Sequence, residues 1–261
     1  MPHLDLAGQP LASHSFYHPI PHMSVASDLC LLPIHGFVPC TVERRLNRFV
    51  VEVLKDGVST RAHINNTGRL LELLEPGRPA ACLLRHRGKT SLRLFALKEG
   101  TGWALIDTRF QMDAFERAVA RGLLPWLAGF HVVARNPRLG ASVLDYRLEN
   151  GRGRQLLLEV KSAVMRDGDF ATYPDCPTER GRRHIREVTG LAREGGSAAI
   201  LFIGALPGVR GFRPWAEGDP AVPGLLSEAS AAGVEVRAMS IRFDGRWGVW
   251  LDDPDLPVDL A

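Results

Sequence analysis

Cysteine is scarce in this sequence. Four residues among 261, Cys30, Cys40, Cys82 and Cys176, lie far apart along the chain. They form no C-x2-C pair, and none has the spacing to histidine that a zinc site requires. This pattern gives no indication of a structural metal site and fits a reduced, cytoplasmic setting.

Long hydrophobic runs are also missing. A membrane-spanning helix needs about 20 consecutive apolar residues, and no run approaches that length, so no membrane partner is expected. There is no glycine-rich nucleotide loop to support an NTPase, and hence no nucleotide cofactor is expected. The hydrophobic content of 45% is ample for a packed core, in one large domain or two small ones.

The first 36 residues contain no lysine or arginine. Secretory and transit peptides need basic residues, so this segment does not fit either class. We expect residues 1–36 to be a disordered or loosely docked extension. The remainder carries all 32 Lys and Arg side chains and all but two of the 29 Asp and Glu side chains, a modest basic excess that supports contact with nucleic acid.

Two β-rich segments place carboxylates inside otherwise apolar strands. Residues 142–148 and 154–161 flank the loop Glu-Asn-Gly-Arg-Gly at 149–153, which has strong turn chemistry and predicts an antiparallel hairpin. Because the hairpin is centred on residue 152, Asp145 should lie opposite Glu159. Directly opposed side chains have Cβ atoms about 4.5–5.5 Å apart.

Two like charges at that distance are unfavourable unless a positive charge compensates them. Lys161 follows Glu159 by two residues and shares its face of the strand. Asp145, Glu159 and the backbone carbonyl of Val160 offer the oxygen ligands that Mg²⁺ or Mn²⁺ prefers, and Lys161 can orient water or neutralise developing charge. This combination predicts phosphodiester hydrolysis. The alternative is a cross-strand salt bridge on a solvated edge.

A basic helix start is the second candidate site. Thr178 is a natural N-cap for a helix over 179–194, and helix N-termini with added arginines favour phosphate. The alternative is a solvated helix whose glutamates pair with its arginines. The basic side chains at this helix start are Arg180, Arg182, Arg183 and His184.

Residues 38–107 show five short β-type runs separated by turns, which is typical of a small barrel. Asn66 and Arg69 precede a predicted short helix at 70–74 and can contact phosphate, or Asn66 can simply form a turn and N-cap. Arg44 and Arg48 are among many cations in this region. Further along, we predict helices at 112–122 and 224–232, and strands at 127–134, 198–204, 234–243 and 246–251, with the 198–204 strand parallel to the 154–161 strand.

Several motifs in order resemble the sugar fermentation stimulation protein A (SfsA) family from about residue 37 onward. They are Arg44-x3-Arg48-Phe49, Asn66-Thr67-Gly68-Arg69, Asp145-Tyr146, Leu158-Glu159-Val160-Lys161-Ser162 and Tyr173-Pro174-Asp175-x2-Thr178-Glu179-Arg180-Gly181-x2-His184. The resemblance implies an N-terminal OB-like β-barrel (37–105) followed by a PD-(D/E)XK nuclease-like α/β domain with a mixed central sheet (106–261). It also implies sequence-nonspecific DNA binding and a connection to sugar (maltose) metabolism. Asp145, Glu159 and Lys161 fall at the catalytic positions of that fold, and Glu116 falls where such nucleases often place a further acidic residue.

Three functions remain open from the sequence. The first is a Mg²⁺- or Mn²⁺-dependent phosphodiesterase acting on DNA, with RNA as a second substrate. The second is a non-catalytic, sequence-nonspecific DNA-binding regulator, and the third is a small-molecule phosphodiesterase or a sugar-responsive protein. The oligomeric state is not determined. The expected nucleic-acid contacts are Arg44, Arg48, Asn66, Arg69, Thr178, Arg180, Arg183 and His184.

Overall fold

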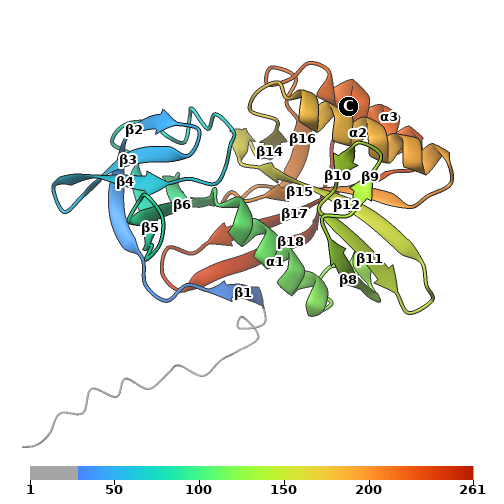
Figure 1. The fold of residues 1–261 in the computed structure, drawn as a ribbon, viewed down its shortest axis with the longest axis horizontal. Helices are drawn as coiled ribbons and strands as arrows, with labels where there is room; N and C mark the ends of the chain where they lie inside the picture. Colours follow the sequence, from blue (N-terminus) through green and yellow to red (C-terminus); the bar gives the residue numbers. More distant parts are fainter. Residues whose placement is uncertain (1–28, 261) are drawn as a thin grey trace, which may run out of the picture.

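A computed structural model describes residues 29–260, which form two β-rich domains lying against each other (Figure 1). Most of the expected extension lies outside the described residues. Its end does not: β1 (Cys30–Pro33) pairs antiparallel with β18 (Gly248–Leu256). The prediction of a disordered or loosely docked segment up to residue 36 is therefore wrong for β1, which pairs with β18 and buries Leu31.

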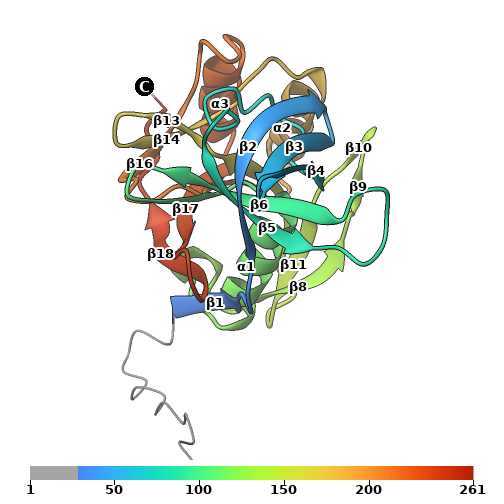
Figure 2. The same cartoon turned by 90° about the vertical axis from the view of Figure 1, so that its left-hand side faces the viewer.

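The first domain is a closed barrel, as expected. The strands follow the order β4-β3-β2-β5-β6-β7, and a parallel pairing of β4 with β6 closes the barrel (Figure 2). The β3–β4 hairpin turns at Asp56 and Gly57, both with positive φ. The strands are β2 (Val38–Asn47), β3 (Val50–Lys55), β4 (Val58–His63), β5 (Pro79–Leu84), β6 (Leu92–Glu99) and β7 (Gly102–Leu105).

Two details of the barrel differ from the sequence prediction. The ten-residue strand β2 was not predicted as a separate strand, because its second half is polar and charged. The short helix expected at 70–74 is only a single turn, in which Leu74 N donates to Leu70 O at 2.9 Å.

The second domain is built on a seven-stranded mixed sheet in the order β1-β18-β17-β15-β12-β11-β8, which confirms the expected α/β architecture. The strands β12 and β15 run parallel, as predicted for the crossover through α2, and β17 is parallel to β15. No helix within residues 29–260 is long and apolar enough to cross a membrane. The helices of this domain, and its strands other than β1 and β18, are α1 (Thr108–Ala120), η2 (Pro125–Leu127), β8 (Phe130–Arg135), β9 (Arg138–Leu139), β10 (Ser142–Val143), β11 (Tyr146–Asn150), β12 (Gln155–Ala163), α2 (Glu179–Arg193), β15 (Ala198–Gly204), α3 (Val222–Ala231) and β17 (Glu235–Phe243).

A small three-stranded sheet was not predicted. It consists of β13 (Met165–Asp167), β14 (Phe170–Tyr173) and β16 (Gly211–Pro214), and β16 lies in a proline- and glycine-rich segment that gave no periodic signal. β14 and β16 pair in parallel although some forty residues separate them. This sheet lies between the barrel and helices α2 and α3 (Figure 1).

An aromatic cluster joins the two domains. Phe243 of β17 packs edge-to-face against Phe95 and Phe37, with ring centroids 5.0 and 5.5 Å apart, and against Trp103 at 5.9 Å. Aromatic pairs at such distances add to the energy of burial. Beside them Leu105 N donates to Ala205 O at 2.9 Å, so the barrel and the sheet are held in one orientation.

Candidate active site

The predicted hairpin has the predicted register, but its first strand begins only at Tyr146, because Ser142–Val143 form β10 and pair with β9. Tyr146 pairs with Leu158 and Leu148 with Leu156, so Asp145, directly before β11, faces Glu159 on β12. The Asp145 carboxylate accepts a 2.8 Å hydrogen bond from Val160 N. The amide and carbonyl of one strand residue point to the same side, so the Val160 carbonyl is directed toward the Asp145 side of the strand.

Glu159 lies in a buried polar network. Its Oε1 atom is 2.5 Å from Lys161 Nζ and 2.6 Å from His184 Nδ1, and the three residues are only 4%, 9% and 2% exposed. Its Oε2 atom is buried and has no hydrogen-bond partner among the described residues. The alternative interpretation is correct only in that Lys161 forms a salt bridge: the bridge joins two residues of one strand rather than crossing strands, and it is buried rather than on a solvated edge.

The charges of this network are set by burial and by each other. Burial, and then the charge of Glu159, raises the pKa of Asp145 to about 6. Burial acts to raise the pKa of Glu159 as well, but the hydrogen bond from His184 and the ammonium of Lys161 outweigh it and lower that pKa. Burial acts to lower the pKa of Lys161, but Tyr173 and Glu159 outweigh it and raise that pKa. Glu159 and Lys161 therefore remain a charged pair at neutral pH.

The raised pKa of Asp145 predicts a pH-dependent stability of the metal-free protein. The folded state holds this proton more tightly than the unfolded state, whose aspartate pKa is near 3.8. The proton on Asp145 therefore adds about 2–3 kcal/mol to the free energy of unfolding below about pH 4, and this contribution is lost as the pH rises through about 6. Urea unfolding in EDTA should show this loss in the wild type. Asp145→Asn should lack it, and parallel pH curves for the two proteins would contradict the prediction.

The donor atoms fit a hard divalent cation. Two carboxylates and one backbone carbonyl converge here, and the unpaired Oε2 of Glu159 leaves a buried acceptor without a donor. Residues 29–260 contain no group of three or more His, Cys, Asp or Glu side chains placed to hold a metal. That is compatible with Mg²⁺, which keeps several waters and is commonly held by one or two carboxylates plus substrate phosphate.

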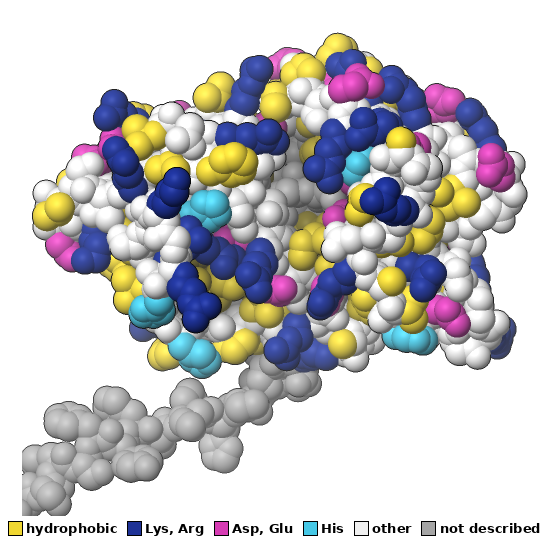
Figure 3. All heavy atoms as spheres, in the orientation of Figure 1, with side chains coloured by type: hydrophobic (Ala, Val, Ile, Leu, Met, Phe, Trp, Pro, Cys, Tyr) yellow, Lys and Arg dark blue, Asp and Glu magenta, His cyan; other side chains and the backbone are white. Residues whose placement is uncertain are grey.

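A cleft of about 640 Å³ lies between the two domains with this network in its wall. Lysine and arginine side chains gather on both sides of the hollow between the barrel and the α/β domain (Figure 3). The predicted site residues that line the cleft are Arg48, Asn66, Arg69, Asp145, Glu159, Val160, Lys161, Thr178 and Arg180.

Other predicted residues lie elsewhere. His184 is buried beside Glu159 and is not available to a phosphate backbone, so its predicted contact with nucleic acid is wrong; it positions the carboxylate instead. Arg44 forms an exposed ion pair with Glu52 on the barrel, and neither it nor Arg183, which donates to Ser142 Oγ at 3.4 Å, lines the cleft.

Glu116 lies next to Asp145 but outside the main cleft. The two residues line a smaller hollow of about 340 Å³. Glu116 is held by the guanidinium of Arg135, and its Oε1 atom accepts from Tyr146 OH at 2.8 Å. These hydrogen bonds, with that from Arg135 as the largest cause, lower the pKa of Glu116 despite its partial burial.

The barrel loop at the cleft is organised by a residue that the sequence analysis did not select. Arg45 donates to the carbonyls of Arg48, Asn66 and Arg69. Asn66 itself is mostly buried and forms the predicted turn, accepting from Gly68 N at 3.0 Å. Its amide donates to Ile106 O at 3.2 Å and lies 3.5 Å from Ser162 Oγ, so Asn66 bridges the domains.

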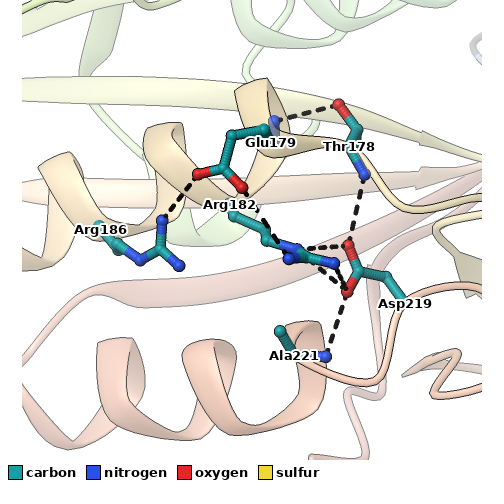
Figure 4. A network of polar contacts seen from close by, with 7 residues as sticks. Thr178, Glu179, Arg182, Arg186, Asp219 and Ala221 are labelled. Carbon is teal, nitrogen blue, oxygen red and sulfur yellow. Dashed lines mark hydrogen bonds and ion pairs between the residues drawn. The ribbon is translucent and has the colours of Figure 1, made fainter.

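Asp219 fixes the start of α2, as Figure 4 shows. Thr178 is the N-cap and accepts from Gly181 N at 3.3 Å, as predicted. The fully buried Asp219 carboxylate accepts from Arg182 at 2.8 and 2.9 Å and from Ala221 N at 3.1 Å. No sequence signal pointed to Asp219, because it lies in a proline- and glycine-rich loop without hydrophobic periodicity.

Asp219→Ala should therefore lower the free energy of unfolding by about 2–3 kcal/mol, because it leaves several half-buried donors, among them the Arg182 guanidinium, without their charged acceptor. Chemical denaturation measures this change. Arg186→Ala is the matched control: it removes only the exposed pair with Glu179, which is worth about 0–1 kcal/mol. Equal effects of the two substitutions would contradict the role of Asp219.

The fold and the site together define a two-domain protein, an OB barrel joined to an α/β domain with a charged cluster at the junction. The chain belongs to the sugar fermentation stimulation protein (SfsA) family. The SfsA N-terminal OB domain matches residues 44–106, and the sugar fermentation stimulation protein RE domain matches residues 109–246.

Similar proteins cover nearly the whole described chain. A sugar fermentation stimulation protein homolog of Pyrococcus furiosus is 46% identical over 215 residues, 82% of this chain and 93% of the relative. One of Archaeoglobus fulgidus is 42% identical and covers 87% of this chain and 98% of its own. The solved structure of Pyrococcus furiosus SfsA in complex with Ca²⁺ superposes with a TM-score of 0.85 at 43% identity, over 88% of this chain and 99% of that one.

Proposed function

We propose that this protein binds nucleic acid in the cleft between its domains and hydrolyses a phosphodiester bond there with a divalent metal ion. The observation that carries the proposal is the buried Glu159 Oε2 atom, which has no partner among the described residues and lies beside Asp145 and Lys161. The Ca²⁺ complex of the Pyrococcus furiosus relative supports a cation as part of the function.

The roles of the residues follow from their contacts. Asp145, Glu159 and the Val160 carbonyl would hold Mg²⁺ or Mn²⁺, which would lower the pKa of a water ligand and stabilise charge on the phosphate. His184 keeps the Glu159 carboxylate in place through its 2.6 Å contact. Lys161, held 2.5 Å from Glu159, places a fixed positive charge where the phosphate becomes more negative.

Cationic side chains from both domains can bind the phosphates of the nucleic acid. Arg48 and Arg69 line the cleft from the barrel, and Arg180 lines it from the first turn of α2. A helix N-terminus adds backbone donors and a partial positive charge, which favour phosphate. The nucleic acid is therefore expected to cross the junction of the domains.

A binding-only function is the second candidate, and one observation favours it. The ion pair of Glu159 with Lys161 already balances the carboxylate charge without a metal. Such a protein would retain DNA without cleaving it, as a sequence-nonspecific regulator with a connection to sugar metabolism.

One assay separates the two functions. Purified protein is incubated with single-stranded DNA, duplex DNA and RNA in Mg²⁺, Mn²⁺ or EDTA. We expect cleavage in the metals, none in EDTA, and none with Asp145→Asn. Retention of DNA without cleavage in any metal would support the binding-only function.

The salt dependence of DNA binding tests the expected phosphate contact at the start of α2. Arg180→Ala should reduce the slope of log K against log salt by about 0.9 for duplex DNA, the value of one phosphate contact. Arg193→Ala is the control, because Arg193 pairs with Glu228 at the other end of the same helix. Equal slopes for the wild type and Arg180→Ala would contradict a phosphate contact there.

A further inference from the structure

Thr172 of β14 carries a buried hydroxyl that has no partner. The residue is 1% exposed, and its Oγ1 atom is among six buried side-chain nitrogen and oxygen atoms of residues 29–260 without a hydrogen bond. Only two of the six belong to residues that line the main cleft, Thr172 and Glu159. The proposed metal already accounts for the unpaired Glu159 oxygen.

Thr172 lies in the wall of the cleft and pairs with Met165 of β13. Both residues line the cleft, together with Lys161 and Ser162 of the adjoining strand β12. Thr172 therefore belongs to the same wall as the charged network.

An unpaired buried hydroxyl is a cost to the free protein. Leaving such a group unsatisfied destabilises the fold by about 1–3 kcal/mol, whereas an apolar group of the same shape would not. Valine has that shape and would suit this β-strand. A group kept at such a cost needs an explanation, and at the wall of a binding cleft the explanation is a ligand.

We propose that the Thr172 hydroxyl donates a hydrogen bond to a phosphate oxygen of the bound strand, at a position next to the scissile phosphate. The nearby cations, Lys161 and Arg69, line the same cleft and favour an anionic acceptor. A hydroxyl can donate to such an oxygen, and bonds to charged groups are stronger than neutral ones. This inference rests on the proposed binding of nucleic acid and adds a substrate-binding residue to it.

Thr172→Val and Thr172→Ser test the inference with a fluorescently labelled 20-nucleotide DNA strand and its duplex in EDTA, where binding is measured without turnover. Thr172→Val should weaken binding about tenfold, the effect of one hydrogen bond to a charged group, and Thr172→Ser should restore it. The ligand-free melting temperature of Thr172→Val should equal or exceed that of the wild type.

Thr189→Val is the matched control. Its hydroxyl is also buried but donates to Ile185 O at 2.7 Å within α2, so its loss should leave DNA binding unchanged. Wild-type affinity in Thr172→Val would overturn the proposal, as would a lowered melting temperature with unchanged binding, which indicates a structural hydroxyl. DNA binding without cleavage by the wild type would refute only the catalytic function, whereas no binding to either probe would refute both.

Discussion

Replacing Glu159 by alanine is expected to lower the free energy of unfolding by about 3–5 kcal/mol. The side chains of Glu159 and Lys161 are only 5% and 10% exposed, and their atoms are 2.5 Å apart. Removing the carboxylate leaves the Lys161 ammonium buried without its closest partner, and leaves His184 Nδ1 without its acceptor. Urea unfolding at neutral pH in EDTA measures the change.

A second substitution separates the loss of the charge from the loss of the side chain. Adding Lys161→Met to Glu159→Ala removes the unpaired charge, so most of the lost stability should return, because replacing both members of a buried pair by apolar groups is often neutral. Cleavage should remain absent in the double variant. A single variant as stable as the wild type would show that Lys161 finds solvent and that the network is not a closed unit.

Lys161→Met should reduce metal-dependent cleavage about 10²- to 10³-fold while leaving DNA retention almost unchanged. The basis is that a fixed positive group directed at developing charge contributes an effect of this size to the chemical step. Both acidic side chains of the proposed metal site, Asp145 and Glu159, stay in place, but Glu159 loses its ion pair with Lys161. Single-turnover cleavage rates in Mg²⁺ or Mn²⁺, measured beside DNA affinity, distinguish chemistry from binding.

The control for this prediction is Lys89→Met, which removes an exposed lysine of the barrel and does not alter the cleft. It should cleave like the wild type. If Lys161→Met instead weakened DNA binding and left the cleavage rate of bound DNA unchanged, Lys161 would be a phosphate contact. If neither quantity changed, the ammonium would serve only to balance Glu159.

Local patterns in the sequence were sufficient to predict the turns, caps and strand registers that depend on residues close together in the chain. Turn residues at 149–153 and the alternation of the flanking strands fixed the hairpin register, and with it the opposition of Asp145 and Glu159. The N-cap Thr178 and the apolar stripe of the following helix predicted α2 to within a residue at its start. The five β-type runs predicted the barrel, whereas the α/β domain with its mixed sheet was implied by the resemblance to the family.

Tertiary structure alone decided how distant segments meet. It placed His184 against Glu159 rather than at the surface, paired β14 with β16, and brought Asp219 to the start of α2. It also left the Thr172 hydroxyl without a partner at the cleft. Hydrophobic periodicity and turn chemistry act within about ten residues along the chain, so they specify strands, helices and registers of adjacent strands. The partners of a buried charge depend on packing between segments 25 to 37 residues apart, which no local pattern encodes.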